Sequence, residues 1–184
     1  MNSLHLNRRQ FGKSALGAVL LLAICSALPA FGQSPKSGKP VIVIDGSLEP
    51  ERIPDWILWR ELFNGALMLA DKAPDSGCEF WQTRLGLSQS QVNQLISHGR
   101  ALREHEKKIN ANAKELDEKK DKVPPGALTS QLHQMQADRE SRVLQIRDEL
   151  KDRIGTHAFL RLQSYLRLNI ARNVKVRVPS SRDK

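Results

Sequence analysis

The sequence predicts an all-α protein organised around one long antiparallel helical hairpin. In the 184-residue chain, the stretch 87–123 contains no proline and carries apolar residues at a strict seven-residue step. A second amphipathic stretch, 126–153, follows Pro124-Pro125-Gly126 and has nearly the same length. Because the turn between them is so short, the two helices must run antiparallel. The apolar row of the first arm is Leu95, Leu102, Ile109, Leu116 and Val123.

The first arm is predicted to begin at a capping box. Ser88 can accept a hydrogen bond from a backbone N–H of the first turn, and Gln91 can reach back to the backbone of Ser88. The two prolines at 124 and 125 are expected to end the helix. At 1.5 Å per residue this arm spans about 50 Å, too long for the core of a small domain. A helix with so narrow an apolar stripe needs a partner.

The second arm carries the matching stripe and is followed by a closing helix. Gly155 interrupts the second arm, and Thr156 is expected to cap a last helix over 157–170. The apolar residues of the second arm are Leu128, Leu132, Met135, Val143, Ile146, Leu150 and Ile154.

An aromatic-rich region precedes the hairpin. Asp55 is expected to cap a helix over 56–71, and a break at 73–77 leads to a short helix that ends near Leu85. All three Trp and two of the five Phe residues fall between positions 56 and 81. Aromatic residues at helical spacing are typical of a core, so this region is predicted to anchor the domain.

Two short β-type segments flank the helices. The run Val-Ile-Val-Ile at 41–44 is typical of a strand or an extended docking segment, and 174–178 alternates apolar and basic residues. They either pair with each other or stay single. The predicted organisation is an export signal at 1–32, a flexible leader with a short extended segment at 33–54, a helical domain at 55–170 and a basic tail at 171–184.

The first 32 residues are predicted to be an export signal. They hold Arg8, Arg9 and Lys13 and no acidic residue, followed by an apolar run at 15–28 and small residues near Gly32. The arginine pair is compatible with a twin-arginine signal and also with an ordinary secretory signal. An uncleaved anchor is the third alternative, although the run is shorter than the roughly 20 residues that span a bilayer. The chain is therefore predicted to be periplasmic or secreted by a bacterium.

The charge and cysteine content beyond residue 32 predict a solvated, mildly basic surface and a single thiol. Of the 29 basic and 20 acidic residues, 26 and 20 lie beyond residue 32, which leaves a net charge of +6 there. Most of these charges are expected on solvated helix faces. Without the signal only Cys78 remains, so no internal disulfide can form. Cys78 is then either a partly buried thiol or a bridge to a second copy in an oxidising compartment.

No pattern in the sequence indicates catalysis or a metal site. His98 and His105 share a helix face about 10 Å apart, and neither has a ligand-type residue three or four positions away. The chain has no Gly-flanked Ser nucleophile, no phosphate-binding Gly loop and no basic patch interleaved with aromatic residues. We therefore expect a non-enzymatic protein with no catalytic residue, no metal, no cofactor and no nucleic-acid partner.

The segment Leu87-Ser88-Gln89-Ser90-Gln91 resembles the Leu-Thr-x-x-Gln motif of the Spy and CpxP type of small periplasmic stress proteins. The resemblance covers about 85–170. It implies an all-helical hairpin that dimerises into a cradle and acts as an ATP-independent chaperone or a modulator of envelope stress. The family's second copy of the motif corresponds here to 154–159, which keeps the cap and the apolar flank but lacks the Gln. Ser88 and Gln91 carry over as structural caps.

The leading functional hypothesis is chaperone-like or stress-related binding of exposed apolar protein segments. The binding residues would be those parts of Leu95, Leu102, Ile109 and Leu116 that the second arm leaves open; alternatively, the same side chains are hairpin core. The narrow seams also predict a homodimer. The second hypothesis is a structural or scaffolding role toward a dedicated envelope protein or a cell-wall polymer. Membrane contact is expected only through the signal segment.

Overall fold

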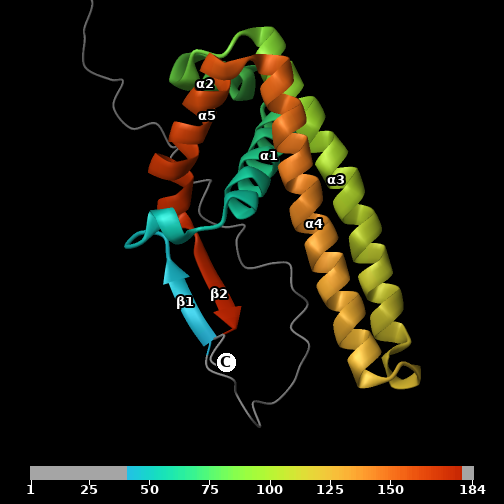
Figure 1. Cartoon of the computed structure of the whole chain (residues 1–184). Coiled ribbons are helices and arrows are strands. Elements are labelled where there is room, and N and C mark those ends of the chain that lie inside the picture. The colour runs from blue at the N-terminus through green and yellow to red at the C-terminus, as the bar shows by residue number, and fades with distance from the viewer. Residues whose placement is uncertain (1–40, 180–184) are drawn as a thin grey trace, which may run out of the picture. The chain divides into compact units, whose positions relative to one another are not determined.

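A computed structural model describes residues 41–179, and the predicted export signal at 1–32 lies outside these residues. Within 41–179 the chain is mostly helical, which confirms the predicted all-α fold with its helical hairpin (Figure 1). No helix in this range is both long enough and apolar enough to cross a bilayer. The main elements are β1 (Val41–Asp45), α1 (Asp55–Lys72), α2 (Pro74–Leu85), α3 (Gln89–Glu118), α4 (Pro125–Ile154), α5 (Thr156–Tyr165) and β2 (Lys175–Pro179).

The hairpin consists of α3 and α4, which have 30 residues each and run antiparallel, side by side (Figure 1). The predicted capping box is present: Gln91 N–H donates to Ser88 Oγ at 3.2 Å, and Ser88 N–H donates to Gln91 Oε1 at 2.9 Å. The predicted end of the first arm is wrong, because α3 stops at Glu118 and residues 120–122 form a 3₁₀ turn. Pro125 instead opens α4, where the missing N–H would have no helical partner in any case.

The hydrophobic core lies where α1 packs between α5 and the hairpin (Figure 1). Trp59 of α1 stacks on Phe159 of α5, with ring centroids 5.0 Å apart. At the crossing of α1 and α3, Gly99 allows a close approach, because a Cβ there would lie only 3.0 Å from the carbonyl oxygen of Phe63. Phe63 and Trp81 are also buried. The aromatic-rich region predicted to anchor the domain therefore supplies much of its core.

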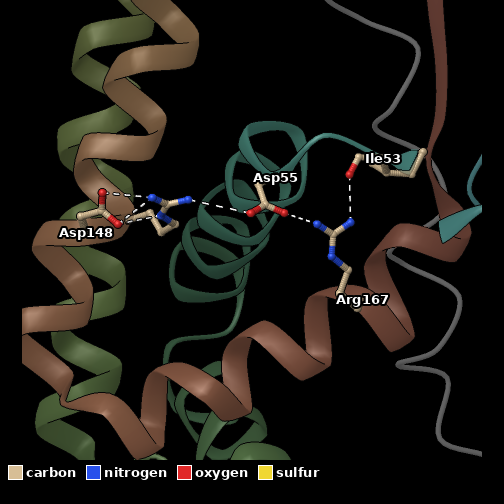
Figure 2. A network of polar contacts seen from close by, with 5 residues as sticks. Ile53, Asp55, Asp148 and Arg167 are labelled. Carbon is tan, nitrogen blue, oxygen red and sulfur yellow. Dashed lines mark hydrogen bonds and ion pairs between the residues drawn. The ribbon is translucent and has the colours of Figure 1, made fainter. Parts of the chain in front are cut away.

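Asp55 does not cap α1, contrary to the sequence-based expectation: Pro54 is the N-cap residue, and no side chain caps the helix. The Asp55 carboxylate accepts a hydrogen bond from Arg167 and lies 3.9 Å from Nη1 of Arg147, so its oxygens face two guanidinium groups (Figure 2). Arg167 also donates to the carbonyl oxygen of Ile53 at 2.9 Å. Arg147 in turn pairs with Asp148 of α4 at 2.8 Å. This network ties the start of α1 to α4 and to the turn after α5.

The chain leaves α4 at Gly155, whose φ of +81° is accessible to glycine at little cost. Gly155 is the N-cap residue of α5, so the expectation that Thr156 caps this helix is wrong. The last predicted helix continues beyond α5 as a π-helical turn, Leu166–Ile170, and a 3₁₀ turn, Ala171–Asn173.

The two β segments pair, as one of the sequence-based alternatives predicted. β1 and β2 form an antiparallel ribbon in which Ile44 lies opposite Val176 and Asp45 opposite Lys175. Lys175 Nζ lies 2.7 Å from the Asp45 carboxylate. Hydrogen bonds from Lys175 and Ser47 lower the pKa of Asp45 to about 2. Ile44 is buried, so the ribbon is attached to the core at this end.

Candidate binding groove at the hairpin tip

The structure places the four predicted binding residues at different depths. Leu95 and Leu102 are fully buried, and Ile109 is 4% exposed. Leu116 is only half-buried. Only Leu116 is therefore left accessible to a ligand by the second arm. The side chains of Leu95, Leu102 and Ile109 lie in the interior of the molecule.

The hairpin has two halves with different surroundings. The proximal half, residues 89–102 and 143–154, contributes to one continuous core with α1 and α5. Among the described side chains of the distal half, residues 103–142, only that of Ile109 is buried, and it lies outside the continuous core. From Gly126 to Arg142 no side chain of α4 is fully buried. In Figure 1 the two arms continue beyond the end of α1. The distal half is therefore held mainly by the contact of one arm with the other.

A polar girdle marks the boundary between the two halves, and several of its contacts join different helices. Arg60 of α1 binds Glu106 of α3, with Nε and Oε1 2.7 Å apart. Arg139 of α4 donates to Asn110 of α3 at 3.2 Å. The girdle consists of Arg60, Glu61, His105, Glu106, Asn110, Asp138 and Arg139.

Burial shifts two pKa values in the girdle. It raises the pKa of Glu61; the neighbouring Arg60 opposes this shift and the Glu106 carboxylate adds to it. Burial also lowers the pKa of Arg139, and the positive charge of Arg60 acts in the same direction. Glu61 pairs with Arg60 of the same helix at 3.8 Å, whereas Arg139 donates across the hairpin to the uncharged amide of Asn110.

The contact of His105 with Asp138 was not anticipated from the sequence. His105 Nε2 of α3 lies 3.4 Å from Oδ2 of Asp138 on α4, because the antiparallel arms bring the two residues to the same level. Within residues 41–179, no three His, Cys, Asp or Glu side chains are grouped so that they could hold a metal ion.

Beyond the girdle, an open groove of about 430 Å³ lies between the distal parts of the two arms. Its apolar floor is formed by Leu116, Val123 and Met135. On the rim, the Glu115 carboxylate and Lys119 Nζ lie 2.5 Å apart and so neutralise each other. The remaining lining residues are uncharged amides: Asn112, Gln131 and Gln134. The groove therefore offers an apolar floor inside a rim without net charge.

The two arms that enclose this groove differ in charge. Residues 103–122 of the first arm contain 13 charged residues, whereas 123–137 contain no Asp, Glu, Lys or Arg. Leu132 of α4 is 37% exposed within this uncharged run. This uncharged run is the sequence signal that distinguishes the distal half of α4 from the charged arm opposite it.

The remaining predicted residues lie away from the groove. Cys78 of α2 is a half-buried free thiol whose Sγ accepts a weak hydrogen bond from Gln89 at 3.7 Å. Its bridge to a second copy stays a prediction. Gln91 does more than cap α3, because its Nε2 also donates to the carbonyl oxygen of Ile154 at 2.8 Å. Gln91 therefore joins the two arms at the end of the hairpin opposite the turn at 119–124.

The fold and the groove define a helical-hairpin protein with an open, apolar tip. No protein-family model, no curated protein and no solved structure matches this chain. The likeness to the Spy and CpxP type therefore rests on the motif at 87–91 and on the hairpin architecture that it implies.

Proposed function

We propose that this chain is an exported, non-enzymatic envelope protein that binds exposed apolar segments of other proteins, in a chaperone-like or stress-related role. The groove at the hairpin tip is the observation that carries the proposal. Leu116, Val123 and Met135 provide an apolar floor that the chain itself leaves partly uncovered. Methionine is unbranched and flexible, so such a floor adapts to ligands of different shape.

The size of the groove favours weak and reversible binding. A Leu or Phe side chain of a client that is buried there gains roughly 2 kcal/mol. The loss of translational and rotational freedom on association offsets much of this gain. A site that accepts one or two side chains therefore releases its client readily, as a holding chaperone must. The neutral rim also imposes no charge requirement on the client.

Export is supported by the order of charged, apolar and small residues at 1–32. The hydrophobic groove also suits an envelope compartment, where unfolded chains arrive after translocation and ATP-driven chaperones do not operate. The proposal needs no cofactor and no metal.

The direct test is light scattering of an unrelated unfolding protein, with and without residues 33–184 at equal molar ratio. We expect suppressed aggregation. Gln134→Glu places a charge at the exposed rim of the groove and should weaken suppression without affecting the fold. Leu160→Glu is the matched control, since Leu160 is 51% exposed on α5. Suppression that is absent, or that both variants reduce equally, would contradict binding at the groove.

A structural or scaffolding role is the second candidate function, and the uncharged run 123–137 favours it. Depletion of charged residues with retention of Met and Leu is typical of a dedicated protein interface. A photo-crosslinking residue at position 134, used in living cells, separates the two roles. One discrete crosslinked product supports a dedicated partner, whereas a broad distribution of products supports many clients.

A further inference from the structure

Among the described residues the β1–β2 ribbon has two unpaired edges, and its register shows which backbone groups lie on each. Gly46 N–H donates to the carbonyl oxygen of Val174 at 2.9 Å, so Gly46 directs its backbone toward β2. Because backbone direction alternates along a strand, Ile44 and Ile42 do the same. Val43 therefore directs its N–H and C=O away from β2. Within residues 41–179 no third strand pairs with either edge.

The free edge of β2 is protected against pairing. On this edge the outward-pointing backbone groups belong to every second residue of β2, namely Lys175, Arg177 and Pro179. Pro179 has no N–H to donate, and the two basic residues add charge to this edge. Charged residues and proline are the usual means by which proteins prevent edge strands from pairing with other chains.

The free edge of β1 lacks this protection. Positions 41–44 read Val-Ile-Val-Ile, without charge or proline. Val43 is 55% exposed and Ile42 is 43% exposed. The one charge of β1, on Asp45, is paired with Lys175 inside the ribbon. An exposed edge of β-branched residues is a site for strand addition, so a folded protein normally keeps it covered.

We propose that the free edge of β1 pairs antiparallel with β1 of a second copy, about a two-fold axis at Val43. The result is a closed dimer with a four-stranded sheet in the order β2-β1-β1-β2. This interface is self-complementary, as a two-fold axis requires: Val43 lies opposite Val43 of the second copy, and Ile42 opposite the second copy's Ile44.

The charges of the ribbon are compatible with this pairing. Asp45 comes opposite position 41 of the second copy, where no charge stands. Each Arg177 lies on an outer strand, opposite Val43 of its own copy. Three strand spacings, about 14 Å, therefore separate the two Arg177 residues. No like charges are brought directly together.

The alternative arrangement, β1 against β2 of a second copy, is disfavoured. Such head-to-tail contacts leave one edge of each copy unpaired, so they add further copies until a ring closes or a filament forms. They would also require the β2 edge, which Pro179 and its basic neighbours protect. The difference between the two edges therefore favours a two-fold dimer over head-to-tail assembly. This inference goes beyond the proposed function and does not depend on it, because the hairpin groove lies on other elements.

Disulfide crosslinking in cells tests the position of the axis. The full chain, with its own N-terminal segment, is expressed with Cys25→Ser, Cys78→Ser and one new cysteine at position 43. Directly opposed Cα atoms of a hydrogen-bonded antiparallel pair lie about 5.5 Å apart, within the range that a disulfide bridges. We expect Val43→Cys to give a covalent dimer on mild oxidation, and Arg177→Cys, on the same sheet face, to give little. Equal crosslinking at both positions, or none at 43, would overturn the proposal.

The molar mass of the purified chain provides the second test. Val43→Pro removes an outward N–H and leaves the hydrogen bonds between β1 and β2 in place, so we expect it to convert the dimer to a folded monomer. Arg177→Pro removes an outward N–H from the protected edge and should leave the dimer intact. Circular dichroism confirms that both variants fold. A monomeric parent chain, or an equal loss of dimer in both variants, would show that β1 does not form the interface.

Discussion

The proximal and distal halves of the hairpin share the same two helices and the same heptad row, yet they differ in burial. Leu102 and Leu116 stand two heptads apart in that row; the first is fully buried and the second half-buried. The difference arises because the continuous apolar core that the hairpin shares with α1 and α5 includes only the proximal half. Periodicity therefore shows which face of a helix is apolar, while the neighbouring elements determine how deeply that face is buried.

The largest difference in stability between the two halves is expected when an aspartate replaces a buried apolar residue in each. Leu102→Asp places an unpaired carboxylate in the continuous core, where its cost is comparable with the whole stability of a domain this size, so the chain should unfold. Ile109→Asp costs no more than local opening of the distal half. All three Trp residues lie between 56 and 81, so tryptophan fluorescence reports the core and far-ultraviolet circular dichroism reports total helix. Ile109→Asp should lose helix and keep native fluorescence.

If Ile109→Asp also abolished the native tryptophan signal, the distal half would be part of the core's cooperative unit. Unchanged helix content in Ile109→Asp would instead show that the side chain at 109 can reach solvent.

A milder pair of substitutions measures the same difference. Leu102→Ala should reduce the free energy of unfolding by about 3 kcal/mol, since it leaves a cavity in a closed core. Leu116→Ala should cost about 1 kcal/mol, because its side chain is half-buried and the groove is already open. Urea denaturation followed by fluorescence and by circular dichroism gives both values. Equal costs would remove the distinction between the halves.

The girdle between the halves is expected to respond to pH through Glu61. Burial raises the pKa of Glu61 above its usual value, so the folded state binds this proton more tightly than the unfolded state. The stabilising effect of protonation is present at low pH and is lost as pH rises through the folded pKa. Glu61→Gln should therefore be more stable than the parent at pH 7, by less than about 1 kcal/mol. The gain should shrink toward pH 4 in parallel urea titrations.

The smallest effect is expected from Cys78→Ser. This residue belongs to α2, away from the groove and the ribbon, and its half-buried thiol already contacts Gln89. We expect an unchanged molar mass with and without reducing agent. A mass that falls in the variant, or in the parent after reduction, would establish the intermolecular disulfide that the lone cysteine permits.

Much of the fold could be predicted from the sequence because its signals are local. The heptad row, the Pro-Pro-Gly turn and the capping box at Ser88 each depend on residues within a few turns of one another. The expected caps at Asp55 and Thr156 were wrong for a different reason. The partner of Asp55 is Arg167, 112 residues later, and no local pattern shows such a contact.

The candidate site could be predicted only in part. Leu116, Val123 and Met135 all belong to the predicted stripes. Their incomplete burial depends on how far along the hairpin the core shared with α1 extends, and the stripes do not show this. The contact of His105 with Asp138 was missed because ligand spacing was considered within one helix, whereas the two residues face each other across the hairpin.

The hydrogen bond from Gln91 to Ile154 has a mechanical consequence for the tip. It joins the first turn of α3 to the last turn of α4, and so fixes how far one helix can slide along the other. Both helices have 30 residues, which corresponds to about 45 Å. A shift at this joint would displace Leu116 from Met135 at the opposite end by the same distance. Glutamate at position 91 could still accept from Ser88 but could not donate to Ile154, so only the amide both caps the helix and sets the axial alignment of the arms.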